Sequence, residues 1–342
     1  MKKVLVIAIF NFFLLGCQNK NTDNFTPLAA TTEDNVVYFN NDWVHAVSSL
    51  TDTISEDKTQ LIVTDLFDAL CKVIPSGKSI RSTYIDTSYT SNAFIQCYKV
   101  NLDADPEKEY LIAAGGLSIN SLIFVLDSVK GKFQMADNFT EENSNQPIIT
   151  IHNNGNYSLF ELTSKGGGTT DYRTDLHRLY KFTGSKIHKV LEAHEGIDIS
   201  GTLKTKTALN MQMWDTTQKE DAVVLHYKAK YWLCNNYDVK NISPQTENSW
   251  DVYRSGSCDP ADGVVILNNE YGLLCRWSAD SMKYIPDYSH GINQQQFFLL
   301  ENINSDEEYA KKIFYAFKKD IDERRHAYNS TFDWLALRFQ EK

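Results

Sequence analysis

Hydrophobic positions follow a helical period near each end of the chain and a strand period through its middle. Between residues 56 and 74, apolar side chains recur every three or four positions, and the run lies between Ser55 and Pro75. This spacing predicts an amphipathic helix capped by Ser55, with acidic side chains in its first turn. Residues 36–50 are apolar and aromatic without a clear period, so strand and helix both fit that stretch.

The middle of the chain, from residue 94 to 300, alternates apolar and polar positions in short runs that end at turn-forming residues. Residues 148–151 and 157–162 flank Asn-Asn-Gly-Asn, and residues 176–182 and 186–191 flank Thr-Gly-Ser. Asn and Gly tolerate positive φ, which tight hairpin turns require. Two antiparallel hairpins are therefore predicted.

A weak internal repeat accompanies these hairpins. Four short strand-turn-strand patterns end in Lys132, Lys186, Lys230 and Lys283, spaced 44 to 54 residues apart. Propeller blades are four-stranded units of about 40–50 residues, so the period suits them. Chance recurrence of a common hairpin in an irregular antiparallel β core is the alternative. The predicted class is mainly β, either propeller-like or irregular, with an N-terminal helical segment and C-terminal helices.

The chain ends in a helical pattern. Ser305 and Glu308 have the spacing of a capping box at a helix start. The apolar positions that follow are Tyr309, Ile313, Phe317 and Ile321. A second short helix is predicted over residues 331–339. Such apolar stripes usually pack against their own domain.

The first residues have the layout of an export signal. Lys2 and Lys3 precede an apolar run over residues 4–15, which ends in Leu-Leu-Gly followed by Cys17. The run is too short to span a bilayer. The segment resembles a bacterial lipoprotein signal, which implies cleavage before Cys17 and lipid on its thiol and new amino terminus. Gln18 is not the aspartate that retains many lipoproteins at the inner membrane, so the outer membrane is favoured. A coincidental cysteine after an ordinary signal peptide is the alternative.

These patterns divide the chain into five segments. Residues 1–16 are the signal peptide and 17–33 a flexible tether, followed by a mixed helical segment over 34–93. Residues 94–300 form the β-rich core, and 301–342 the C-terminal helices.

The net charge argues against two classes of partner, and the cysteines indicate possible disulfide bridges. The formal net charge of −10 argues against nucleic acid and against an anionic bilayer surface as partners. Apart from Cys17 there are five cysteines, and an exported chain sits where disulfides persist. One bridge is expected among Cys234, Cys258 and Cys275, and Cys71 with Cys97 is a weaker possibility.

An acidic loop is the strongest candidate for chemistry. Side-chain oxygens recur at Asn101, Asp103 and Asp105, and Glu109 follows immediately before an apolar strand. Oxygen ligands at the first, third and fifth positions of a tight loop, with a later acid, suit a hard cation such as Ca²⁺. A solvated acidic turn between two strands is the alternative.

The loop resembles the aspartate-rich loop of FG-GAP/VCBS-type β-propeller blades, whose pattern is Asp-x-Asn/Asp-x-Asp-Gly-x-x-Asp before a Leu-Ile-Val-Gly strand. Asn101, Asp103, Asp105 and Glu109 fall on its ligand positions, and Pro106 stands where that loop has its glycine. The resemblance covers about twenty residues and implies a structural calcium ion.

Local catalytic motifs are absent from the sequence. A run of glycines, Gly166, Gly167 and Gly168, followed by Asp171, is a candidate binding loop whose amides could face an anion, or a plain hairpin loop. His188, Glu192, His194 and Glu195 could approach a metal, but a solvated turn is the preferred interpretation of that stretch.

These observations favour a non-catalytic binding module, lipid-anchored in the cell envelope, for an envelope protein or a glycan. A periplasmic immunity or inhibitor protein against a toxin or hydrolase is one alternative. A glycoside or peptidoglycan hydrolase with carboxylates dispersed over several strands is another, since such a site leaves no local motif.

Overall fold

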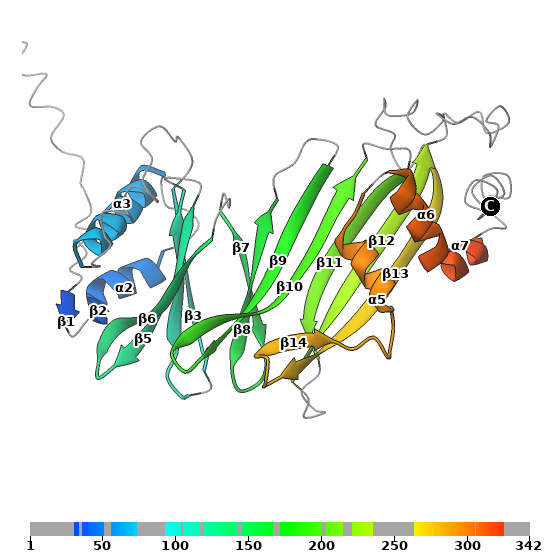
Figure 1. Ribbon diagram of the computed structural model, residues 1–342. Coiled ribbons are helices and arrows are strands. Elements are labelled where there is room, and N and C mark those ends of the chain that lie inside the picture. Colours follow the sequence, from blue (N-terminus) through cyan, green and yellow to red (C-terminus); the bar gives the residue numbers. More distant parts are fainter. Residues whose placement is uncertain are drawn as a thin grey trace, which may run out of the picture.

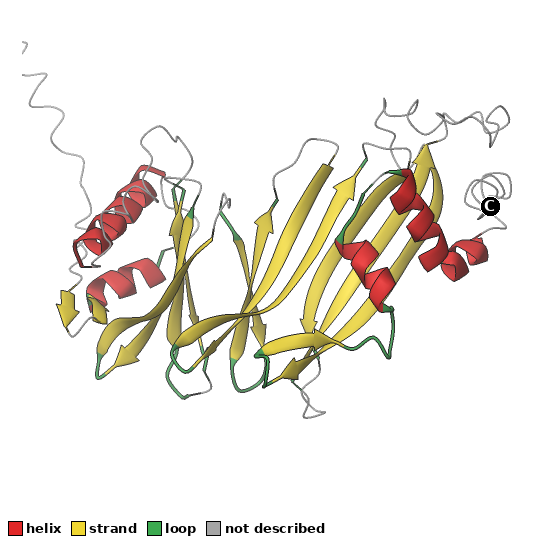
Figure 2. Ribbon diagram, in the orientation of Figure 1, coloured by secondary structure: helices red, strands yellow, loops and turns green. Residues whose placement is uncertain are grey.

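Two antiparallel β-sheets form most of the molecule, and helices lie at either end of it (Figure 1). The structure is a computed structural model that describes residues 31–33, 36–50, 56–73, 93–103, 105–116, 120–141, 146–166, 172–199, 203–214, 221–234, 263–304 and 306–324. Strands predominate and the helices fall into two groups, so the predicted mainly β class with helical segments toward both ends is confirmed (Figure 2).

The first sheet contains six strands in the order β1-β2-β6-β5-β4-β3. Their bounds are β1 (Thr31–Glu33), β2 (Val36–Phe39), β3 (Phe94–Val100), β4 (Glu109–Gly115), β5 (Ser121–Val129) and β6 (Lys132–Glu141). Strand β1 occupies the last three residues of the segment that was expected to be a flexible tether. Strand β3 is at one edge of this sheet.

The second sheet contains eight strands that follow one another in chain order. They are β7 (Ile148–Asn153), β8 (Ser158–Lys165), β9 (Tyr172–Thr183), β10 (Lys186–Asp198), β11 (Leu203–Met213), β12 (Ala222–Cys234), β13 (Gly263–Ser278) and β14 (Lys283–Pro286). Both predicted hairpins are confirmed, as β7–β8 and β9–β10. Gly184 and Ser185, in the second turn, have φ of 58° and 65°.

The predicted repeat does not produce propeller blades in the described residues. Its units around Lys132, Lys186 and Lys283 are the hairpins β5–β6, β9–β10 and β13–β14. The unit around Lys230 is no hairpin, because β12 runs unbroken from Ala222 to Cys234. No glycine or asparagine separates Tyr227 from Lys230, so nothing there favours positive φ. The irregular antiparallel core is the form that the structure takes.

Two helices, α2 (Asn41–Ser48) and α3 (Glu56–Val73), cover one face of the first sheet (Figure 1). Residues 36–50 contain both a strand and a helix. Asn40 follows the last residue of β2 and caps α2, since its side chain accepts a hydrogen bond from Asp42 N. Helix α3 confirms the helix predicted after Ser55. Trp43 and Phe67 are fully buried in this layer, against Phe124 of β5.

The other helices, α5 (Gln294–Glu301), α6 (Glu307–Ala316) and α7 (Lys318–Arg324), pack on the second sheet. The sequence did not predict α5. The cap of α6 is Asp306, whose carboxylate accepts from Tyr309 N at 2.7 Å, so the predicted Ser305 cap is wrong by one residue. The helix also breaks at Phe317, although Phe317 and Ile321 are buried as the apolar stripe predicts. Residues 331–339 lie outside the described part.

The sheets share a core where the free face of the first sheet meets β8 and β9 of the second. Tyr180 stacks between Phe160 and Phe139, with ring centres 5.2 and 4.7 Å apart. Asp137 of β6 accepts a hydrogen bond from Ile187 N at 2.8 Å, and Asn101 O accepts one from Ser158 N at 2.7 Å. Apolar stacking and backbone hydrogen bonds therefore hold the two sheets together.

Asp221 draws together distant parts of the second sheet. Tyr157 and Tyr284 donate to its two carboxylate oxygens at 2.6 and 2.5 Å, and Lys181 Nζ lies 3.0 Å away. The same ammonium lies 4.1 Å from the centre of the Trp277 ring system. This cation–π contact and the shared carboxylate bring the β7–β8 turn and β14 close to the start of β12.

Replacement of Phe124 by alanine tests the core of the first sheet. Phe124 is fully buried and stacks on Phe39 at 5.7 Å, so Phe124→Ala should lower the free energy of unfolding by about 3–5 kcal/mol. Urea denaturation measures the loss. The control is Leu61→Ala on α3, where the side chain is 63% exposed and little change is expected. Equal losses for the two variants would contradict the helix-on-sheet packing.

Candidate functional site

The acidic loop lies between β3 and β4, and the structure brings its predicted ligands together. Carboxylate oxygens of Asp103, Asp105 and Glu109 lie within 4.8 Å of one another. Backbone amides stabilise the loop. Asp105 N donates a hydrogen bond to the Asp103 carboxylate at 3.1 Å, and Glu107 N donates one to the Asp105 carboxylate at 2.7 Å. Asn101 braces it too, because its Nδ2 donates to the backbone oxygen of Asp105 at 2.6 Å.

Glu109 differs from the two aspartates because it is buried, with 1% of its surface exposed. Its Oε2 accepts from Leu102 N at 2.5 Å, while its buried Oε1 accepts no hydrogen bond from any described residue. Burial raises the pKa of this carboxyl to about 7, and the charges of Asp103 and Asp105 add to the rise. A buried carboxylate oxygen without a donor is unfavourable, and a cation would satisfy it.

A further acid near the loop was missed from the sequence. Asp127 lies on β5 and its pKa is raised, mainly by burial and also by the charges of Asp103 and Asp105. The pairing of Tyr110 with Leu126 places Asp127 level with the start of β4. Only the register of the β4–β5 hairpin reveals this proximity, because the acidic pattern of the loop ends at Glu109.

The other predicted site residues fall mainly on undescribed parts of the chain. Cys17, Gly167, Gly168 and Asp171 lie outside the described residues. Gly166 follows β8, and a Cβ at its position would lie 1.8 Å from Thr174 O on β9. Close approach of two strands therefore accounts for glycine at this position.

The cysteine predictions are partly corrected. Cys97 and Cys275 are free thiols, which excludes a Cys71–Cys97 bridge and any bridge to Cys275. Burial raises the pKa of both thiols to about 12, so neither is a reactive nucleophile. Cys258 lies outside the described residues, and so does any pairing with Cys234.

A buried polar network crosses the second sheet from β7 to β10, and sequence reasoning found only one of its members, Glu195. Glu161 accepts from His152 Nε2 at 2.7 Å and from His177 Nδ1 at 2.6 Å. His177 Nε2 faces Glu195 at 3.6 Å. Burial opposes both shifts. The hydrogen bonds with His152 and His177 lower the pKa of Glu161 to about 2. The hydrogen bond with Glu161 and the nearby charge of Glu195 raise the pKa of His177 to about 9. Glu161 and His177 are therefore both ionised at neutral pH.

The solvated turn expected around His188 to Glu195 is wrong, because these residues belong to β10. The strand contains a bulge between Lys189 and Leu191. His194 pairs with Glu301 of α5 at 3.2 Å, while Glu195 faces His177. Adjacent side chains of a strand point to opposite faces, so His194 and Glu195 join different clusters and not one metal site.

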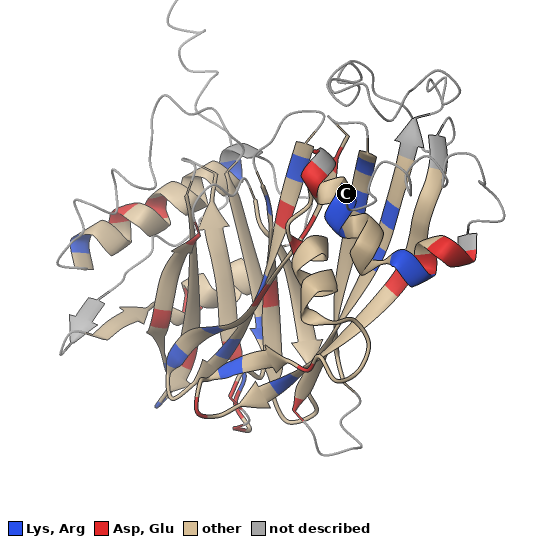
Figure 3. Cartoon of the chain, turned by 45° about the vertical axis from the view of Figure 1, so that its right-hand side comes forward, with Lys and Arg blue, Asp and Glu red and all other residues tan. Residues whose placement is uncertain are grey.

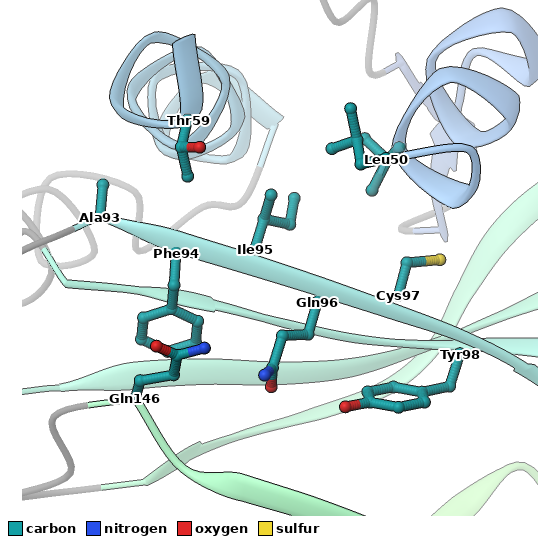
Figure 4. A pocket seen from close by; sticks show the side chains of 10 residues that line it. Leu50, Thr59, Ala93, Phe94, Ile95, Gln96, Cys97, Tyr98 and Gln146 are labelled. Atoms are coloured by element: carbon teal, nitrogen blue, oxygen red, sulfur yellow. The ribbon is translucent and has the colours of Figure 1, made fainter. Parts of the chain in front are cut away.

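Two adjoining pockets, of about 510 and 380 Å³, follow the edge strand β3. Residues 93–98 line the first pocket. Leu50, which follows α2, Thr59 of α3 and Gln146 complete its lining (Figure 4). Residues 99–101 line the second, with Ile151 and Asn153 of β7. We call the two pockets together the edge groove. Its first pocket lies beside β3 next to α2 and α3, and its second lies between the end of β3 and the β7–β8 hairpin.

Charges are spread over the molecule, with acidic and basic residues interspersed along both sheets (Figure 3). Within the edge groove the charged lining residues are two exposed lysines, Lys99 and Lys108. The groove is therefore locally basic in a protein with a net charge of −10.

Comparisons with known proteins give no further indication of function. No family model, curated protein or solved structure matches this chain. In the part of the chain that the structure describes, none of the helices has the length and apolar character needed to cross a membrane.

The buried network predicts a specific dependence of stability on pH. His177 has its folded-state pKa raised from 6.5 to about 9, so its contribution to stability is complete below pH 6.5 and is lost as pH rises through 9. Glu161 has its pKa lowered from 4.5 to about 2, so its contribution is present above 4.5 and is lost as pH falls through 2. The pair should therefore stabilise the fold most between about pH 4.5 and 6.5.

Urea denaturation of the wild type and of His177→Gln over pH 6–10 measures this contribution. The variant should be less stable at pH 6, and the difference should shrink above pH 9 as wild-type His177 loses its proton. Parallel stability curves would contradict the assignment.

Glu161→Gln should lower the free energy of unfolding by roughly 3–5 kcal/mol at pH 6, because it leaves a buried imidazolium without its partner.

Proposed function

We propose that the protein is a lipid-anchored cell-envelope protein that acts as a calcium-dependent, non-catalytic binding module for an envelope protein or a glycan. The observation that carries the proposal is the acidic loop, where two carboxylates surround a buried glutamate whose Oε1 accepts no hydrogen bond from the described residues.

Asp103, Asp105 and Glu109 would hold the ion. Ca²⁺ takes six to eight oxygen ligands, so water or backbone oxygens would complete its shell. Its charge would favour the ionised form of Glu109, whose pKa burial raises to about 7. Ion binding and loss of this proton are therefore coupled.

The position of the loop explains why an ion would matter for binding. Asn101 lies at the start of the loop, and its backbone oxygen accepts the hydrogen bond from Ser158 of the second sheet. Asn101 also lines the edge groove. An ion that orders this loop would therefore fix both the junction of the sheets and one wall of the groove.

Glu161, Glu195 and Glu109 are each unsuited to general-acid catalysis. A general acid needs a raised pKa and access to substrate. Against the effect of burial, hydrogen bonds with His152 and His177 lower the pKa of Glu161, and the nearby His177 lowers that of Glu195, so neither is a general acid at neutral pH. Glu109 has a raised pKa but is 1% exposed and cannot reach a substrate.

The anchor rests on the amino-terminal sequence. A basic start, an apolar run and Leu-Leu-Gly before Cys17 support lipidation, and Gln18 favours the outer membrane. Multiple acyl chains bind a bilayer firmly, so the folded part need not supply membrane affinity. The binding surfaces would then face the aqueous envelope.

Calcium binding is tested by thermal unfolding of the full chain in detergent, with millimolar calcium and then with chelator. A ligand that binds only the folded state stabilises it by roughly 2.7 kcal/mol at a hundred times its dissociation constant, which is several degrees here. Asp103→Asn and Glu109→Gln should abolish the shift, and Asp280→Asn, in the exposed β13–β14 turn, should retain it.

The metal-free protein gives an independent readout at the same residue. Because the folded-state pKa of Glu109 is raised from 4.5 to about 7, ionisation of its carboxyl should lower the stability of the wild type as pH rises through 7. Glu109→Gln carries no such charge, so with chelator at pH 8 it should unfold at a higher temperature than the wild type. If calcium does not change the unfolding temperature of the wild type, the ion site is refuted.

Lipidation is tested by fractionation of cells that express the wild type, Cys17→Ala or Cys97→Ala. Wild type and Cys97→Ala should sediment with the membranes, and mass spectrometry should find an acylated amino-terminal Cys17. Cys17→Ala should lose the acyl mass and move to the soluble fraction. Membrane retention of Cys17→Ala without acylation would refute the anchor.

A further inference from the structure

The edge groove has a shape that suits one kind of ligand. Nine consecutive residues, 93–101, line it on the β3 side. Consecutive residues of a strand point to opposite faces, so a groove that touches all of them follows the strand's edge. At about 3.3 Å per residue, this edge extends roughly 30 Å.

We propose that the edge groove binds an extended peptide of a partner protein, which adds a strand to β3. This inference rests on the proposed binding role and names its partner class. Among the described residues, β3 and β7 each pair with a neighbouring strand on one side only. The backbone of an edge strand presents a row of donors and acceptors, and an added strand satisfies them.

The side chains of β3 provide two walls for such a peptide. Ala93, Ile95 and Cys97 point toward α2 and α3, where Leu50 and Thr59 face them (Figure 4). Alternate residues of an added strand would enter this apolar wall, as strand addition requires. The groove thus selects apolar residues at every second position of the peptide.

The opposite wall is mixed, because Phe94 is apolar and buried while Gln96 and Tyr98 carry polar groups. Phe94, Gln96 and Tyr98 point away from the helices, toward the side where Gln146 lies (Figure 4). Gln96 Oε1 is buried and accepts no hydrogen bond from the described residues. A donor on the intervening positions of the peptide, such as a serine or asparagine, would satisfy this oxygen.

The far end of the groove sets the direction of the peptide. Lys99 and Lys108 are exposed there, and the backbone bond between Asn101 and Ser158 closes the groove. Two ammonium groups favour a peptide with an acidic residue at this end. The expected ligand therefore alternates apolar and small polar residues and ends in aspartate or glutamate.

A peptide fits these features better than a glycan does. The long axis of the groove follows the backbone of a strand. The hydrogen-bond donors and acceptors of that backbone have the spacing that a second, added strand also has. The apolar wall of Leu50 and Ile95 offers nothing to sugar hydroxyls. Glycan binding is therefore the competing outcome of the test.

The test uses the full chain in detergent with calcium, against a phage-displayed library of random 12-residue peptides and a glycan array. Selected peptides should share the alternating apolar pattern with an acidic end. In hydrogen–deuterium exchange, a selected peptide should slow by about tenfold or more the alternate amides within residues 94–100 that face the free edge and do not bond to β4. Protection elsewhere, or selection of no peptide, overturns the proposal.

Three variants locate the peptide. Lys108→Glu should weaken binding by about tenfold, and a peptide with lysine at its acidic end should restore it. Gln146→Trp, an exposed position, should obstruct the groove and weaken every selected peptide. Lys206→Glu, the same charge change on an exposed position of β11, should bind as the wild type does. Glycan binding that Gln146→Trp abolishes, without peptide binding, also overturns the proposal.

A repeat with chelator separates this inference from the calcium site. Peptide binding with no effect of calcium on unfolding would uphold the edge groove and refute the ion. A calcium shift without any selected peptide would uphold the ion and refute the strand addition.

Discussion

The contact between the two sheets is the constraint on which the rest of the structure depends. Tyr180 stacks between Phe160 and Phe139, the backbones meet at Asn101 and Ser158, and side chains of β6 such as Asp137 and Glu141 contact the second sheet. The sheets thus share a core without sharing a ladder. Their edge strands β3 and β7 are not paired with each other, and the second pocket of the edge groove lies where the end of β3 approaches β7.

Buried charge is the second constraint. His152, Glu161, His177 and Glu195 come from four successive strands, and each relies on the register of its neighbours. Removal of Glu161 or of His177 leaves the charge of the other without its nearest partner in the interior, which costs more than a lost apolar contact of similar size. A one-residue slip of any of these strands would move its polar member to the opposite face, so the network also specifies register.

Local chemistry made much of the fold predictable from sequence. Gly184 and Ser185 adopt the positive φ that a two-residue hairpin turn needs, and helix α3 follows its apolar period. The propeller expectation treated Leu225 to Tyr231 as a hairpin, although no turn residue separates its halves. Which strands pair, and into how many sheets, depends on contacts between distant residues, and one sequence does not carry that information.

The site was predictable to a similar extent. The spacing of Asp103, Asp105 and Glu109 indicated a common cluster, because ligands of one short loop need no tertiary information. Asp127 and the pair of Glu161 with His177 were missed, since strand register alone brings them to their neighbours.

The order of the strands also has a consequence for how the chain acquires its structure. Every neighbour in the second sheet is the next strand in the chain, so each new strand can add to the last, and only the step from β12 to β13 has to close a long connection, residues 235–262. The first sheet is different, because β2 pairs with β6 across the intervening helices and three strands. Non-local pairing is slow, since the entropy of closing the loop precedes any contact. A chain made from its amino terminus must therefore leave β2 paired with β1 alone until β6 arrives, and the amino-terminal layer is the part most exposed to misfolding.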